Sequence, residues 1–208
     1  MASGGFLCSE PGVLHKIREN MRKGANSMPT IFLSPSTQEF NAYYDGNGTE
    51  EQYMNAIADE MVPYLEASGI TVVRNTPEDT ALTSAQKSNA ADVQLHLAIH
   101  SNAAPEQLAG QLRGHDVYYY EGSEQGRQAA EIIANNLTLI VPTPRQVEVI
   151  PTTRLAELRR TKAPAVLVEV AYHDNPDDAN WIRRSIRDIA RNLSVSAADY
   201  FAVPFRQP

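Results

Sequence analysis

The sequence contains a single cysteine, Cys8, among its 208 residues. One cysteine cannot form a disulfide within the chain, and a thiolate metal site or a catalytic cysteine is excluded for everything that follows it. No run of apolar residues approaches the ~20 that a membrane-spanning helix needs. Positive charge is also scarce, because 25 acidic residues oppose 18 basic ones and leave a net charge of −7. That balance argues against nucleic acid or an anionic membrane surface as the partner.

Residues 1–27 differ in character from the rest of the chain. They hold a short apolar patch and a basic cluster from Lys16 to Lys23, but neither the long apolar core nor the small-residue cleavage site of a secretion signal. The remaining sequence begins cleanly at Met28. We therefore expect a leader or non-native segment over 1–27 and one domain over 28–208, which is long enough to bury a substantial core.

Short apolar runs alternate with helical patterns after Met28, which is typical of an α/β domain. The expected strands cover residues 30–33, 70–74, 93–100, 116–120 and 165–168, and residues 147–150 form either a strand or part of the rim of a substrate site. The expected helices run from Thr49 to about Gly69 and over 81–91, 125–137 and 177–200. No internal repeat, low-complexity tract or linker to a second domain interrupts the pattern.

One of these strands ends in a carboxylate. Residues 165–168 form an uninterrupted apolar run, as a parallel strand buried on both faces requires. Glu169 follows directly, so it would lie at the carboxyl edge of the sheet, where open α/β sheets bind ligands. Because an ionised carboxylate there is costly unless a cation or a proton offsets it, Glu169 is a candidate functional residue.

The strand over 93–100 ends in a similar way, in His100. A single histidine at a strand end is more often a hydrogen-bonded residue than a ligand, but two strands that end in His and Glu favour a site. These residue types bind zinc, or exchange protons as base and acid. His96 lies about 13 Å earlier at ~3.3 Å per residue, so we expect a hydrogen-bonded core histidine there.

Together the two segments resemble the signature strands of the zinc-dependent N-acetylmuramoyl-L-alanine amidases called amidase type 3. The motifs are Leu158-x-x-Thr-x-x-Pro-Ala-x-Leu-Val-Glu169 and Ala98-Ile-His-Ser-Asn102-Ala, and the similarity extends over roughly residues 29–203. The resemblance implies a single α/β domain whose twisted mixed, largely parallel sheet is flanked by helices. It also implies Zn²⁺ as cofactor and hydrolysis of the amide between N-acetylmuramic acid and L-alanine in peptidoglycan.

The same resemblance implies a role for individual residues. His100 matches a zinc ligand and Glu169 the general base that takes and delivers the proton. Glu50, at the start of the first helix, matches a second ligand, and Glu51 is the alternative; either carboxylate also suits a helix N-terminus without any metal. The candidate substrate contacts are Asn102 and Arg159.

The chain departs from the family pattern after its first strand. Typical members have Asp-Pro-Gly-His there, and that histidine is a ligand, whereas this sequence has Ser34-Pro-Ser-Thr37. His173 can replace the missing ligand only if the chain bends after Glu169, because four extended residues span about 13 Å. Asp174 would then orient the His173 ring. Glu39 is another candidate replacement.

The missing histidine leaves a second function open, a non-catalytic peptidoglycan-binding or regulatory domain that has lost metal binding. A serine hydrolase is a third possibility, but no Gly-x-Ser-x-Gly elbow surrounds Ser34, Ser36 or Ser101. The resemblance implies a bacterial or phage origin. Since no export signal is evident, we expect a cytoplasmic protein that reaches the cell wall on release.

Overall fold

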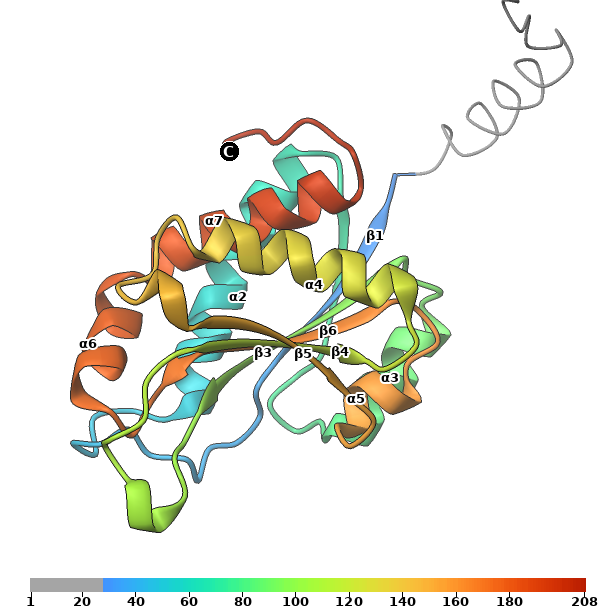
Figure 1. Ribbon diagram of the computed structural model, residues 1–208. Coiled ribbons are helices and arrows are strands. Elements are labelled where there is room, and N and C mark those ends of the chain that lie inside the picture. The colour runs from blue at the N-terminus through green and yellow to red at the C-terminus, as the bar shows by residue number, and fades with distance from the viewer. Residues whose placement is uncertain (1–27) are drawn as a thin grey trace, which may run out of the picture.

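The structure, a computed structural model, describes residues 28–208, so the leader expected over 1–27 lies outside the described residues. At its centre is a six-stranded sheet in the order β2-β1-β3-β6-β4-β5 (Figure 1). Neighbouring strands are parallel except β4 and β6, which confirms the mixed, largely parallel sheet. The strands are β1 (Thr30–Pro35), β2 (Thr71–Arg74), β3 (Leu95–Asn102), β4 (His115–Tyr120), β5 (Val147–Thr152) and β6 (Ala165–Tyr172).

Helices cover both faces of the sheet (Figure 1). The first face carries α2 (Glu50–Ala67), α4 (Glu124–Leu137) and α7 (Ile186–Tyr200). The second face carries α3 (Ala81–Ala90) and α5 (Ala156–Arg160), which pack against each other. α6 (Pro176–Arg184) follows the carboxyl end of β6, and two 3-10 turns, η1 (Glu106–Leu108) and η2 (Pro144–Gln146), lie in connections.

The start of α2 is set by local sequence. The Thr49 side chain accepts from the Gln52 N–H while the Gln52 side chain accepts from the Thr49 N–H, a reciprocal capping box. The apolar residues at helical spacing then face the sheet, as the sequence predicts, and are fully buried: Met54, Ile57, Ala58, Met61 and Leu65. The cap therefore fixes Glu50 as the first residue of α2.

Alternation along β3 and β6 decides which side chains share a face. Successive residues of a strand point to opposite faces. Leu95, Leu97 and Ile99 belong to the main core under α2, α4 and α7, whereas Ala98 packs with Leu167 in a smaller cluster on the other face. By the same period, His100 and Glu169 lie on the second face, beyond the end of that smaller cluster.

Two expectations about elements need correction, and one helix was not expected. β3 and β6 run beyond His100 and Glu169, so His100 is not the last residue of its strand and Glu169 lies inside its strand rather than after it. The segment before β6 contains the short helix α5. The expected helix over 177–200 is two helices, because the Ser185 N–H turns back to the carbonyls of Trp181 and Ile182 and ends α6 there. No helix within residues 28–208 combines the length and apolarity needed to cross a bilayer.

Candidate functional site

His100 and Glu169 are neighbours in the sheet. They are register partners in the parallel pair β3–β6. Asp116 of β4 is opposite Glu169 in the antiparallel pair β4–β6. Three ionisable side chains from three strands therefore lie side by side on the second face, in the half of the sheet where β3 and β6 end.

Glu50 joins this group from the first turn of α2. Its Oε1 lies 2.9 Å from His100 Nδ1 and accepts from the Ser101 N–H at 3.3 Å. The register of β3 against β6 shifts between His100 and Asn102, next to this contact. Glu50 is 1% exposed, and it, rather than Glu51, is the first-turn carboxylate in contact with His100.

Burial and mutual charge shift the pKa values in this group. Burial alone would raise the pKa of Glu50, but its hydrogen bonds to His100 and Asn41 hold that pKa below the usual value. Burial opposes a charge on His100, yet the Glu50 carboxylate raises the His100 pKa to about 9. For Glu169, burial outweighs the nearby imidazole and raises the pKa to about 7. Its Oε2 atom is buried without a hydrogen-bond partner.

The loop between β1 and α2 supplies two side chains that sequence reasoning missed. Asn41 Nδ2 donates to Glu50 Oε2 at 2.6 Å and to Gln38 Oε1 at 3.1 Å. Gln38 Nε2 lies 3.4 Å from His100 Nδ1. The segment reads as a polar loop, and no periodicity marks which side chains turn inward. The one available signal was that Gln38 follows Thr37, the position of the missing histidine.

Asn102 is linked to Glu169 by way of Asp116, the residue opposite Glu169 on β4. Its Nδ2 donates to Asp116 Oδ2 at 3.2 Å, and the Tyr118 hydroxyl donates to the same oxygen at 3.2 Å. Burial raises the pKa of Asp116 above its usual value. The structure thus brings Asn102 to the group, and its contact with a substrate stays a prediction.

His173 takes other partners, which argues against its expected place beside His100. The chain stays extended in β6 to Tyr172 instead of bending after Glu169. The His173 ring stacks on Tyr43 at 5.5 Å, and its Nδ1 lies 3.0 Å from Ser101 Oγ. Ser101 points to the face opposite His100, because the two are consecutive in β3. Asp174, expected to orient the ring, instead accepts from the Gly110 N–H.

The other expected residues lie apart from the group. Arg159 is exposed on α5, at the amino end of β6, whereas Glu169 lies in its carboxyl half, which argues against Arg159 as a contact for the same ligand. Glu39 is exposed on its loop. Glu157 of α5 meets His96 Nε2 at 2.7 Å, which confirms His96 as a buried, hydrogen-bonded histidine. Over residues 28–208, no three His, Cys, Asp or Glu side chains form a metal-binding group.

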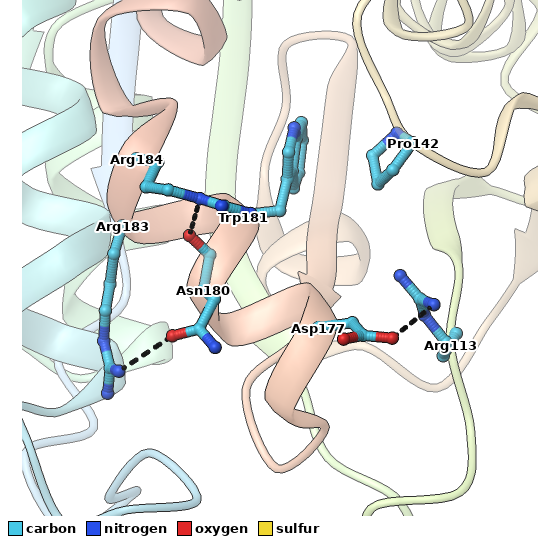
Figure 2. Close-up of a pocket in the computed structure, with 7 residues that line it drawn as sticks. All are labelled: Arg113, Pro142, Asp177, Asn180, Trp181, Arg183 and Arg184. Atoms are coloured by element: carbon cyan, nitrogen blue, oxygen red, sulfur yellow. Dashed lines mark hydrogen bonds and ion pairs between the residues drawn. The ribbon is translucent and has the colours of Figure 1, made fainter.

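A surface pocket of about 620 Å³ lies beside α6 (Figure 2). Two of its arginines already have carboxylate partners: Arg113 pairs with Asp177 at 2.9 Å, and Arg183 with Asp45 at 2.5 Å. Glu50, His100 and Glu169 do not line it, so the candidate site is their group rather than this pocket. The pocket is lined by Arg113, Pro142, Asp177, Asn180, Trp181, Arg183 and Arg184.

Known proteins share this fold. An N-acetylmuramoyl-L-alanine amidase of Clostridium difficile 630 superposes with a TM-score of 0.74 over 86% of this chain and 98% of its own, at 18% identity. The amidase AmiC2 of Nostoc punctiforme gives a TM-score of 0.72 over 85% of this chain and 98% of its own, also at 18% identity. At such identities the likeness establishes the fold alone.

Sequence comparison finds related amidases as well. The N-acetylmuramoyl-L-alanine amidase LytC of Bacillus subtilis is 28% identical over 193 residues, 89% of this chain and 38% of LytC. The probable cell wall amidase LytH of Staphylococcus saprophyticus is 26% identical, over 79% of this chain and 56% of LytH. The chain thus spans well under two thirds of the curated relatives it matches. The sequence profile of the N-acetylmuramoyl-L-alanine amidases matches residues 36–197, most of the chain. This protein therefore belongs to the amidase type 3 family of N-acetylmuramoyl-L-alanine amidases.

Proposed function

We propose that the protein is a peptidoglycan hydrolase that cleaves the amide between N-acetylmuramic acid and the L-alanine of the stem peptide. One observation carries the proposal: Glu50, His100 and Glu169, from three separate segments, meet near the carboxyl ends of the central strands β3 and β6. These are the residues to which the resemblance in sequence assigns the family's ligand and base roles. LytC and LytH are named as amidases, which supports the same bond as the target.

The residues present suit a divalent cation, and we propose Zn²⁺. A carboxylate oxygen and an imidazole nitrogen 2.9 Å apart can face a common ion, and this is the donor chemistry of zinc hydrolases. The buried, unpartnered Glu169 Oε2 favours a positive charge nearby. Glu50 and His100 would hold the ion, which would polarise the amide carbonyl and lower the pKa of water.

Glu169 would be the general base. Its pKa of about 7 makes both protonation states accessible near neutral pH, so the same carboxyl group can take a proton from water and deliver it to the departing nitrogen. The Asp116 carboxylate on β4, hydrogen-bonded to Asn102 and Tyr118, lies opposite Glu169 of β6 and contributes to keeping that pKa high.

The test is hydrolysis of purified peptidoglycan, with and without added Zn²⁺. Release of stem peptides with a new L-alanine amino terminus is expected with zinc and is expected to stop with a chelator. Purified wild-type protein that releases none of these peptides, with zinc bound and its fold intact, would overturn the proposal.

A second candidate, a peptidoglycan-binding or regulatory domain, is favoured by one observation. Thr37 replaces the family's histidine, so Glu50 and His100 are the two expected ligands in contact, and no three His, Cys, Asp or Glu side chains within residues 28–208 have the arrangement of a metal site. Elemental analysis separates the two: about one zinc per chain supports the hydrolase, whereas peptidoglycan binding without zinc or turnover supports the binding domain.

A further inference from the structure

Two side chains make opposite demands on His100 Nδ1. The Glu50 carboxylate can only accept, so its contact at 2.9 Å requires an N–H on that nitrogen. The Gln38 amide nitrogen can only donate, so its approach to 3.4 Å requires a lone pair on the same atom. One ring nitrogen cannot satisfy both. Facing Glu50, Nδ1 carries a proton, and with the proposed zinc its lone pair would bind the ion, so in neither case is it free to accept from Gln38.

Asn41 fixes which end of the Gln38 amide faces the site. Its Nδ2 group donates both to Glu50 Oε2 at 2.6 Å and to Gln38 Oε1 at 3.1 Å. Exchanging oxygen and nitrogen in Gln38 would set two NH₂ groups against each other. Turning Asn41 as well would direct its oxygen at the Glu50 carboxylate. The carboxylate therefore orients Asn41, and Asn41 in turn directs Gln38 Nε2 toward His100.

The Gln38 N–H consequently points at His100 Nδ1, which has no lone pair to offer it. An oxygen atom placed in the group formed by Glu50, His100 and Glu169 would accept it. In the proposed reaction that oxygen belongs to the scissile amide carbonyl, which gains negative charge as water adds to the carbon. A preoriented N–H donor aimed at such an oxygen stabilises this charge, as the donors of an oxyanion hole do.

We propose that Gln38 is a catalytic residue that donates its Nε2–H to the carbonyl oxygen of the scissile amide, and that Asn41 positions it. The inference rests on the proposed function and adds to it a residue next to the position where the family's first histidine is missing. Gln38 thus compensates for part of that loss by neutral hydrogen bonding rather than by binding the metal.

The test separates this role from metal binding and from folding by three measurements on each variant: kcat and KM on peptidoglycan, the Kd for Zn²⁺ alone, and the unfolding midpoint. Gln38→Ala is expected to lower kcat about 100-fold or more, with little change in the zinc Kd. Gln38→Glu keeps the shape but replaces the donor with an acceptor. It is expected to bind zinc at least as tightly as the wild type while losing a similar or larger part of kcat.

Glu39→Ala is the matched control, because Glu39 is the exposed neighbour of Gln38 on the same loop. It is expected to leave all three measurements near the wild-type values. The inference is overturned if wild-type protein is active and Gln38→Ala keeps kcat within a few-fold, or if Gln38→Ala loses zinc, which would make Gln38 a ligand. If zinc-loaded wild-type protein has no activity, the proposed function itself fails and this inference with it.

Discussion

Glu50 and His100 are 50 positions apart in the sequence, yet their carboxylate and imidazole lie 2.9 Å from each other. Two local features create the contact. The Thr49 capping box begins α2 so that Glu50 is its first residue, and β3 carries His100 to the same edge of the sheet. The pair is almost wholly buried, so each charge depends on the other or on a shared cation.

The first prediction concerns which first-turn carboxylate binds metal. Glu50→Gln removes the charge that faces His100, and we expect the Zn²⁺ affinity to fall about 10-fold or more, as judged from the effect of lesser changes around metal sites. The measurement is competition against a fluorescent chelator. Glu51→Gln is the matched control in the same turn, and equal losses in the two variants would assign both residues only to the helix dipole.

The second prediction concerns the proton. Glu169→Gln leaves a neutral amide of the same shape where the base stood, and we expect turnover on peptidoglycan to fall by about 100-fold to 10,000-fold. The zinc Kd and peptidoglycan binding should change little, because Glu169 is not proposed as a ligand. Glu148→Gln removes an exposed carboxylate from β5 and serves as the control. Turnover that survives in Glu169→Gln would assign the base to another residue.

Much of the fold was predictable because its signals are local. The apolar runs that become β3 and β6, the helical spacing after Thr49 and the resulting strand–helix alternation each depend on a few consecutive residues. Strand ends were less predictable. Polar residues at His100 and Glu169 suggest that the strands stop, but backbone pairing continues past them, and pairing does not depend on side-chain polarity.

The site was predictable where it lies on strands and a capped helix, and not where it lies on a loop. Glu50, His100 and Glu169 come together as expected because regular elements fix their directions. Gln38 did not stand out, since its orientation follows from a chain of hydrogen bonds through Asn41 that no sequence period encodes.

The third prediction concerns the loop that carries those two amides. The Arg183 guanidinium donates to both Asp45 oxygens, at 2.5 and 2.8 Å, and to the Asn47 carbonyl at 2.8 Å. It also lies 5.1 Å from the centre of the Tyr43 ring. A lysine cannot make this forked contact. We expect Arg183→Lys to lower the free energy of unfolding by about 1–3 kcal/mol. We also expect it to lower turnover, because the loop then holds the Gln38 and Asn41 side chains less firmly in place.

Arg184→Lys is the control for that change, because Arg184 is exposed and its Nε donates only to the Asn180 carbonyl of its own helix (Figure 2). It should leave both measurements within error of the wild type. Urea unfolding and peptidoglycan turnover, measured on the same preparations, report the two effects. Unchanged turnover in a destabilised Arg183→Lys protein would show that the contacts of Arg183 with Asp45 and Asn47 support the fold without positioning the site.

The fourth prediction concerns pH and a histidine outside the site. His115 is wholly buried, and this burial lowers its pKa below the usual 6.5. As pH falls through 6.5 the unfolded chain therefore takes up a proton at this ring before the folded protein does. The stability that neutral His115 supplies above 6.5 is then lost, at up to about 1.4 kcal/mol per pH unit.

Urea unfolding of wild type and His115→Gln at about pH 8 and about pH 5.5 isolates this loss, because the other histidines are common to both. The wild type should lose more stability between the two pH values than the variant, and equal losses would place the acid sensitivity elsewhere.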